Sequence, residues 1–153
     1  MTGARERIER LYREQGDRVW RALFAYGGDR EVASDAAAEA FTQALARGDA
    51  IRSPEAWVWQ AAFRIAAGEL KRRRRAAPVV REGAYDLPEP LDHVFAAMRR
   101  LSPNQRAAVL LHDYADRPTD EVAVALGVTR ATVHVHLSQG RRRLRRLLED
   151  TDA

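Results

Sequence analysis

The chain contains no cysteine in its 153 residues, and this absence excludes several kinds of chemistry at once. Disulfide bonds, thiolate nucleophiles and cysteine-ligated zinc all need that residue. Apolar runs of the length that a membrane span needs are also missing. The amino terminus, MTGARERIERLY, is charged where a signal peptide has its apolar core. We therefore expect a soluble cytoplasmic protein with no membrane insertion.

Recognisable active-site patterns are absent from the sequence as well. It has no serine elbow, no phosphate-binding glycine loop and no paired-carboxylate motif. His134 and His136 lie two positions apart, and on a helix their side chains would point about 200° apart, so they cannot chelate one ion. His112, Asp113 and Asp116 offer only a weak acid and base pattern near a predicted helix end. We expect a protein that is not an enzyme and that carries no metal and no other cofactor.

Lysine is nearly absent, since Lys71 is the one lysine among 26 basic residues. Two stretches concentrate the positive charge: Lys71 to Arg75 is basic throughout, and five arginines lie between Arg141 and Arg146. Because each neutralised phosphate releases condensed counterions, two such clusters favour two contacts with a polyanion. The alternative is two solvated helix ends, because cations also stabilise the carboxyl terminus of a helix.

Apolar residues recur at helical spacing through the first 75 residues, and strand-like alternation is missing. We predict a first helix that ends before Gly27-Gly28-Asp29 and a second from about Arg30 to Arg47. Ser53-Pro54 is typical of a helix start, and the third helix would run from there into the basic cluster. Trp57 belongs to its apolar stripe and is expected in the core, which leaves Trp59 at the surface.

Residues 76–90 contain three prolines and one glycine and show no helical period, so we predict a linker. Fully extended, this segment would reach roughly 50 Å, which is about one and a half turns of duplex DNA. We therefore expect an all-α protein of two small helical domains, residues 1–75 and 91–153, joined by a flexible linker. A linker of this reach would let the two domains contact separate DNA sites.

The second domain carries several helix-start signals. Ser102-Pro103-Asn104-Gln105 combines a proline at the first helical position with a capping box, in which the serine and glutamine lie three residues apart. That helix would run to about Tyr114. Thr119 is expected to cap a short helix that ends before Gly127, and Thr129 to cap the last helix. Two helices separated by a tight turn predict a helix-turn-helix, and an ordinary helical hairpin is the alternative.

Residues 101–148 resemble region four of bacterial RNA polymerase sigma factors of the extracytoplasmic-function (ECF) type. The resemblance rests on the opening Leu-Ser-Pro-x-Gln-Arg, on Asp-Glu-Val-Ala before Ala-Leu-Gly-Val, and on Thr132-Val133 in the last helix. The first half is similar to region two of the same family. There GDREVASDAAAEAF, residues 28–41, resembles the helix that docks on the polymerase clamp. AWVWQAAFRIAAGELKRRRR, residues 56–75, resembles the helix that melts and reads the minus-ten element.

This resemblance implies an ECF-type sigma factor, which binds core RNA polymerase and directs promoter-specific transcription initiation. Core RNA polymerase and promoter DNA would be its partners, and an anti-sigma factor would be a further one. The alternative is a sigma-like DNA-binding transcriptional regulator that does not recruit polymerase. That alternative is motivated by Ser34 and Ala38, which stand where the family commonly has glutamate and glutamine on the clamp-binding helix.

The resemblance also assigns residues to each contact. The minus-thirty-five duplex would be bound by Arg130, Thr132, His134, Val135, Ser138, Gln139, Arg141 and Arg142. The minus-ten strand would be bound by Trp59, Arg64, Lys71, Arg72, Arg73 and Arg74. Contact with polymerase would come from Asp35, Ala38 and Glu39.

Elementary chemistry indicates how some of these side chains would act. Gln139 could bond an adenine edge in two places, and Val135 could meet a thymine methyl group. Trp59, near the basic cluster, would stack on the bases of a melted strand. Gly140 costs roughly 1 kcal/mol of helix stability. We therefore expect a looser helix just before the arginine-rich end.

Overall fold

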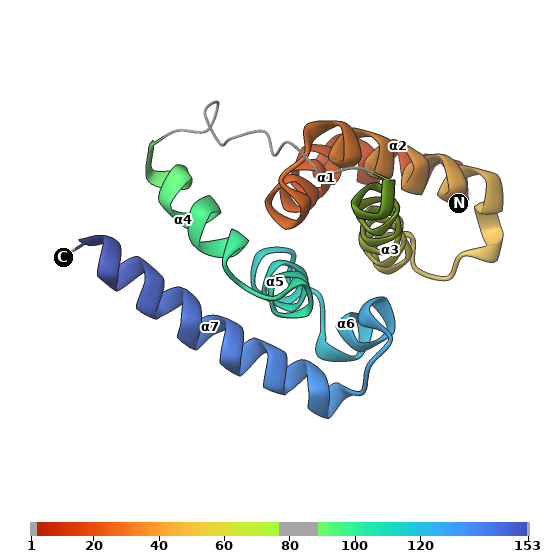
Figure 1. Ribbon diagram of the computed structural model, residues 1–153. Coiled ribbons are helices and arrows are strands. Elements are labelled where there is room, and N and C mark those ends of the chain that lie inside the picture. Colours follow the sequence, from red (N-terminus) through yellow and green to blue (C-terminus); the bar gives the residue numbers. More distant parts are fainter. Residues whose placement is uncertain (1–2, 77–88, 153) are drawn as a thin grey trace.

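The computed structural model describes residues 3–76 and 89–152, and within them the chain is built from seven α-helices without a β-strand (Figure 1). The predicted all-α class is confirmed. The helices are α1 (Ala4–Gly27), α2 (Arg30–Arg47), α3 (Pro54–Ala76), α4 (Glu89–Arg99), α5 (Pro103–Val109), α6 (Thr119–Leu126) and α7 (Arg130–Asp152). Among these helices, none is both long enough and apolar enough to cross a membrane.

Local signals set the ends of the first three helices where the sequence predicts them. Gly28 adopts a left-handed conformation with φ of 70°, which ends α1. Asp29 then caps α2 by accepting a hydrogen bond from the Val32 amide at 3.0 Å. A single 3-10 turn, Gly48–Ala50, follows α2, and the Ser53 hydroxyl accepts from the Ala56 amide at the start of α3. The three helices pack on one another and bury the first part of the core.

The capping box at the start of α5 is present as predicted. The Ser102 hydroxyl accepts from the Gln105 amide at 3.2 Å, and the Gln105 side chain accepts from the Ser102 amide at 3.2 Å. After Val109 the helix continues for one π-helical stretch, Leu110–Tyr114, and stops at the predicted residue. The second of these hydrogen bonds also fixes the orientation of the Gln105 amide, because its oxygen must face the Ser102 N–H.

Helices α6 and α7 form the predicted helix-turn-helix. Gly127 makes the turn in a left-handed conformation with φ of 68°, and Val122 and Val133 are fully buried where the two helices meet. Thr129 caps α7 by accepting from the Thr132 amide at 3.1 Å. The predicted cap at Thr119 is wrong: Pro118 occupies the capping position without a side-chain bond, and Thr119 is already helical.

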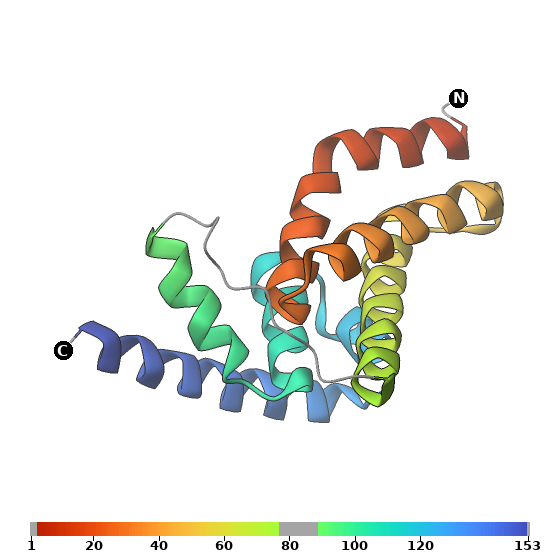
Figure 2. The ribbon, with the colours of Figure 1, turned by 45° about the horizontal axis from the view of Figure 1, so that its top comes forward.

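The two halves of the chain pack against each other and share one core. Helix α3 lies against α6, and α1 lies against α4 and the end of α5 (Figures 1 and 2). Phe24 and Phe95, one from each half, bring their ring centroids to 5.0 Å. Of the predicted linker, residues 77–88 lie outside the described residues. Ala76 ends α3, and Glu89 and Pro90 begin α4, so these three positions are helical rather than linker.

Arg106 lies at the centre of the contact between the halves. Its side chain is 8% exposed and donates hydrogen bonds to the carbonyl oxygens of Met98, Leu101 and Tyr26. Arg99 donates to the same Tyr26 oxygen at 2.8 Å. Tyr26 belongs to the last turn of α1, where unpaired helix carbonyls attract cations. One buried guanidinium group therefore joins the end of α1 to the end of α4.

A second polar chain crosses the contact between the halves. Arg117 pairs with Glu55 of α3 and with Glu121 of α6, the latter at 2.8 Å. Glu55 also accepts from the Gln15 amide at 3.0 Å, and Gln15 in turn accepts from the Trp59 indole at 3.0 Å. The chain runs from the core of the first half to the turn before α6, so α6 is held in place relative to α3.

Replacing Arg106 by alanine should lower the free energy of unfolding by about 2–4 kcal/mol, because three buried carbonyl groups lose a charged donor. The measurement is urea unfolding of the full chain followed by circular dichroism. Arg100, exposed at the end of α4, provides the matched control, and Arg100→Ala should change the stability by less than about 0.5 kcal/mol. Equal effects of the two substitutions would contradict the central role of Arg106.

Candidate nucleic-acid interface

Helix α7 presents most of the predicted duplex-binding residues on one exposed face. Seven of the eight side chains are exposed: Arg130, His134, Val135, Ser138, Gln139, Arg141 and Arg142. Val135 is an apolar side chain left 50% exposed in the middle of this face. Thr132 is half-buried, and its hydroxyl pairs with that of the capping Thr129 at 2.9 Å. Thr132 therefore supports the start of the helix, and the seven others lie at the surface, where a ligand can reach them.

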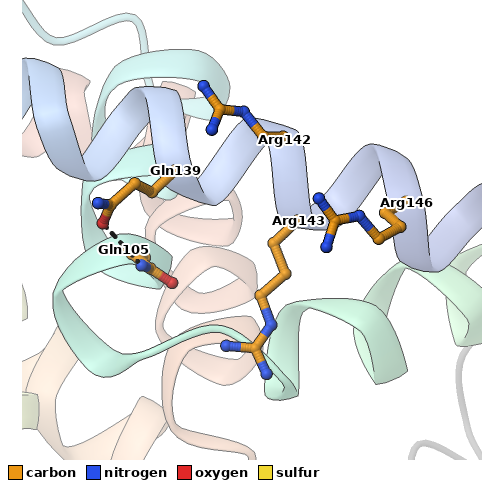
Figure 3. Close-up of a pocket in the computed structure, with 5 residues that line it drawn as sticks. All are labelled: Gln105, Gln139, Arg142, Arg143 and Arg146. Carbon is orange, nitrogen blue, oxygen red and sulfur yellow. Dashed lines mark hydrogen bonds between the residues drawn. The ribbon is translucent and has the colours of Figure 1, made fainter.

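Two hollows lie along the exposed face of α7. One is lined by His134, Leu137, Ser138, Arg141, Arg142 and Arg145. The other is lined by Gln105, Gln139, Arg142, Arg143 and Arg146, and Figure 3 shows its side chains. Both are shallow and arginine-rich, and no acidic residue lines either of them. Their chemistry suits an anion with several acceptor oxygens.

Arg141 is the one predicted phosphate-binding arginine of α7 that already has a partner among the described residues. Its guanidinium group makes two hydrogen bonds to the Asp113 carboxylate, one of them at 2.9 Å. These bonds raise the pKa of Arg141 above its usual value. A phosphate at Arg141 would therefore have to displace or share the bond with Asp113.

Gly140 is buried where α5 and α7 cross. A Cβ atom at this position would lie 3.1 Å from Val109 Cγ2 and 3.4 Å from the Gln105 carbonyl oxygen. The sequence led us to expect a looser helix at Gly140, but α7 is continuous through this residue. The residue has no side chain because the two helices approach closely, so its cost in helix propensity is offset by packing.

The basic cluster at the end of α3 is partly neutralised by carboxylates of its own half. Arg73 reaches Asp29 at 2.9 Å, Glu31 at 3.4 Å and Glu69 at 3.3 Å, so it ties α3 to the start of α2. Arg72 also hydrogen-bonds to Glu69, and this bond is the main cause that lowers the pKa of the Glu69 carboxyl. A phosphate at Arg73 would therefore have to displace or share the bonds that Arg73 makes with these carboxylates.

The remaining predicted cations of α3 are open to solvent. Lys71, Arg72 and Arg74 are exposed near its carboxyl end, and Arg64 is exposed two turns earlier. Lys71, Arg74 and Arg64 make no ion pair within residues 3–76 and 89–152. These side chains remain available to a polyanion.

The predicted placement of the two tryptophans of α3 is wrong. Trp59 is 1% exposed and its indole nitrogen is bonded to Gln15, so it cannot stack on a base in this structure. Trp57 is half-buried, and the Arg47 guanidinium carbon lies 5.2 Å from its ring centroid. Trp57 is therefore the tryptophan of α3 with a ring face near the surface.

A signal for the correct tryptophan is present in the sequence. Val58, Trp59, Ala62, Phe63 and Ala66 are all buried, and they recur at steps of one, three and four residues. Such spacing defines the apolar face of a helix. The apolar stripe that we predicted through Trp57 is shifted by one position from this buried face. The shift is the reason that the prediction placed Trp57, and not Trp59, in the core.

The predicted polymerase-binding residues of α2 share an exposed surface. Asp35, Ala38 and Glu39 are all exposed, and Glu39 accepts from the Gln43 side chain at 2.9 Å. Ser34 accepts a hydrogen bond from the Trp20 indole at 2.9 Å, so its hydroxyl helps to hold α2 on α1. This surface of α2 is exposed to solvent, and it presents the carboxylates of Asp35 and Glu39 beside the methyl group of Ala38.

Trp59→Phe should lower the free energy of unfolding by about 1–3 kcal/mol, because the Gln15 carbonyl loses its buried donor. Trp57→Phe, the matched control two residues away, should change stability by less than about 1 kcal/mol. Acrylamide quenching provides a second measurement, since the Trp59→Phe protein should keep only the more accessible tryptophans. A larger loss of stability from Trp57→Phe would contradict the placement of the two rings.

Comparison with known proteins agrees with this geometry. Residues 93–144 match the family model described as sigma-70, region 4. The ECF RNA polymerase sigma factor SigE of Mycolicibacterium smegmatis is 28% identical over 154 residues, which cover 90% of this chain and 60% of that protein. The chain thus spans about 60% of the length of this curated relative.

Two solved structures share the fold. The sigma factor RpoE, crystallised with the anti-sigma factor NepR from Bartonella quintana, matches with a TM-score of 0.77 at 18% identity, covering 92% of this chain and 96% of that one. CnrH, in complex with the cytosolic domain of CnrY, matches with a TM-score of 0.69 at 22% identity, covering 95% and 89%. The predicted resemblance to sigma factors of the ECF type is confirmed.

Proposed function

We propose that this chain acts as an ECF-type sigma factor, which binds core RNA polymerase and directs it to particular promoters. The observation that carries the proposal is the exposed, arginine-rich face of α7, placed on a helix-turn-helix within the segment that matches sigma-70 region 4. A helix in this position can enter the major groove by its amino-terminal residues. A cytoplasmic location, where polymerase and DNA are found, is part of the proposal.

Base reading would fall to the first half of the exposed face of α7. His134 and Ser138 line one hollow together and can donate or accept hydrogen bonds at base edges. Val135, exposed between them, can contact a thymine methyl group. Helix α7 contains no arginine or lysine between Arg130 and Arg141. This part of the helix would therefore distinguish base pairs by shape and by neutral hydrogen bonds, and not by charge.

The first half of the chain would hold the melted strand and the polymerase. Trp57, with Lys71, Arg72 and Arg74 farther along α3, combines an aromatic face with exposed cations. Stacking on a ring and pairing with cations is how proteins hold single-stranded DNA. The exposed surface formed by Asp35, Ala38 and Glu39 of α2 would dock on core polymerase.

An anti-sigma factor is a further partner in this proposal. The sigma factor RpoE, whose fold this chain shares, was crystallised with the anti-sigma factor NepR. An anti-sigma factor of this chain would have to be found by co-purification from the native host, where a stoichiometric partner is expected.

Run-off transcription tests the proposed function directly. The full chain added to core RNA polymerase should yield transcripts from templates selected out of a random promoter library, and core alone should not. Reversing the charges of α2 with Asp35→Arg and Glu39→Arg should abolish transcription but leave duplex binding intact. Asp17→Arg, which makes the same change in charge as either single substitution but on the exposed surface of α1, is the control and should have little effect.

Duplex binding without core binding would favour the alternative function, a sigma-like DNA-binding regulator. Ala38 supports that alternative, because it offers no polar group on the exposed surface of α2. Pull-down with core polymerase separates the two functions. No binding to core under any condition would rule out the sigma factor.

The Arg141–Asp113 pair generates a prediction about DNA affinity. Asp113→Asn should strengthen binding to a duplex of any sequence by roughly threefold to tenfold, because it frees Arg141 and removes a negative charge beside the DNA. Arg141→Ala should weaken binding to all sequences and lower the slope of log K against log salt by about 0.9. Fluorescence anisotropy over a range of salt concentrations measures both effects.

Asp17→Asn is the control for Asp113→Asn, since it changes the net charge equally on the exposed surface of α1. It should leave the affinity close to that of the unaltered chain. Equal gains from the two aspartate substitutions would show that total charge, and not the release of Arg141, controls binding.

A further inference from the structure

The side chains of Gln105 and Gln139 meet between α5 and α7 (Figure 3). Gln105 Nε2 donates a hydrogen bond to Gln139 Oε1 at 3.2 Å. Gln139 is exposed and Gln105 is half-buried, so the bond lies at the edge of the exposed face of α7. It joins a residue of the capping box to a residue that the sequence assigns to base reading.

A backbone amide fixes the orientation of both side-chain amides. The Ser102 N–H donates to Gln105 Oε1 at 3.2 Å, and a backbone N–H can only donate. Gln105 must therefore turn its oxygen toward Ser102 and its NH2 group toward Gln139. Because an NH2 group can only donate, Gln139 turns its oxygen inward and its own NH2 group outward. The capping box thus decides which atom of Gln139 faces a ligand.

The hollow beside this hydrogen bond presents donors and positive charge. Besides the two glutamines it is lined by Arg142, Arg143 and Arg146, whose guanidinium groups have no acceptor atom. None of the three makes an ion pair or a hydrogen bond with another described residue. Figure 3 shows Gln139 and Arg143 extending from the same side of α7. The three guanidinium groups and the Gln139 NH2 group of these lining residues can only donate, which fits an anion better than a base edge.

An adenine edge is a poor match for this arrangement. Recognition of adenine by glutamine uses the side-chain oxygen and nitrogen together, because the base offers a donor and an acceptor. Here the Gln105 amide takes one of the two lone pairs of Gln139 Oε1 and holds that oxygen toward α5. A phosphodiester group offers acceptors alone and carries the charge that three arginines without a partner among the described residues attract.

We propose that the hollow formed by Gln105, Gln139, Arg142, Arg143 and Arg146 binds a phosphate of the DNA backbone. In this site Gln139 binds the DNA backbone and does not read a base. Gln105 is a positioning residue that sets the direction of the Gln139 amide. The inference rests on the proposed function in one respect, namely that α7 contacts duplex DNA. It assigns base reading to the preceding turns of α7, at His134, Val135 and Ser138.

Four variants of the full chain test the site, with affinity measured by fluorescence anisotropy on a duplex of random sequence. Gln139→Ala removes the outward donor, and Gln105→Ala removes its support. Gln105→Glu keeps the capping box, because a carboxylate still accepts from Ser102, but it can only accept from Gln139 and so reverses that amide. Asn104→Ala removes an exposed amide one residue away from Gln105 and is the matched control.

The expected result is a graded loss that does not depend on DNA sequence. Gln139→Ala should weaken binding by roughly twofold to tenfold, the effect of one hydrogen bond, and should leave the salt slope unchanged. Arg143→Ala should lower that slope by about 0.9, the effect of one phosphate contact. Gln105→Glu should weaken binding more than Gln105→Ala does, and Asn104→Ala should have no effect. Thermal unfolding midpoints of all variants check that the fold is kept.

Three outcomes would overturn the inference. In the first, Gln139→Ala changes only the preference between duplex sequences, which restores base reading to Gln139. In the second, Gln105→Glu binds like the unaltered chain, which removes the positioning role of Gln105. In the third, inorganic phosphate at constant ionic strength binds the hollow without weakening duplex binding, which identifies a site for a free anion. If the unaltered chain binds no duplex at all, the proposed function itself fails, and this result is distinct from the other three.

Discussion

One buried cation, Arg106, holds the two halves of this protein together. Its guanidinium group reaches carbonyl oxygens from the last turn of α1, from the last turn of α4 and from the turn that follows α4. Burial of a charge is costly unless hydrogen bonds compensate it, so the side chain has few alternative positions. Because Arg106 belongs to α5, it fixes α5 against the carboxyl end of α1, where the helix dipole also favours a positive charge.

The position of α7 follows from that of α5. Gly140 lets the two helices approach so closely that a Cβ atom at this position would lie 3.1 Å from Val109 Cγ2 and 3.4 Å from the Gln105 carbonyl oxygen. The Gln105 side chain then spans from the capping box to Gln139. The short helix α5 therefore links the first half of the chain to the exposed face of α7. Arg106 fixes α5 to the first half, and α7 packs against the other side of α5. Gln105 then orients the Gln139 side chain on the exposed face of α7.

Helix ends could be predicted from the sequence because their signals are local. Asp29, Ser53, Ser102 and Thr129 each accept a hydrogen bond from a backbone amide within three residues, and a pattern search can recognise that. Other features depend on distant residues. The apolar spacing that buries Trp59 is local, and we assigned it one position out of register, but the Gln15 side chain that pairs with its indole lies 44 positions away, and Asp29 binds Arg73 at the same separation. The packing of the halves depends on Arg106 and Tyr26, 80 positions apart, which no local pattern reveals.

In the proposed contact with duplex DNA, the length of α7 would separate base reading from phosphate binding along one helix. A helix rises about 1.5 Å per residue, so the twelve steps from His134 to Arg146 extend about 18 Å. A straight helix of that length, entering by its amino-terminal end, cannot stay within a major groove about 12 Å wide. Its later turns must pass over the groove edge and meet the phosphate backbone. Arg142, Arg143 and Arg146 lie on those later turns, and among the described residues they have no ion-pair partner, so their charges would be placed where phosphates, and not bases, are within reach.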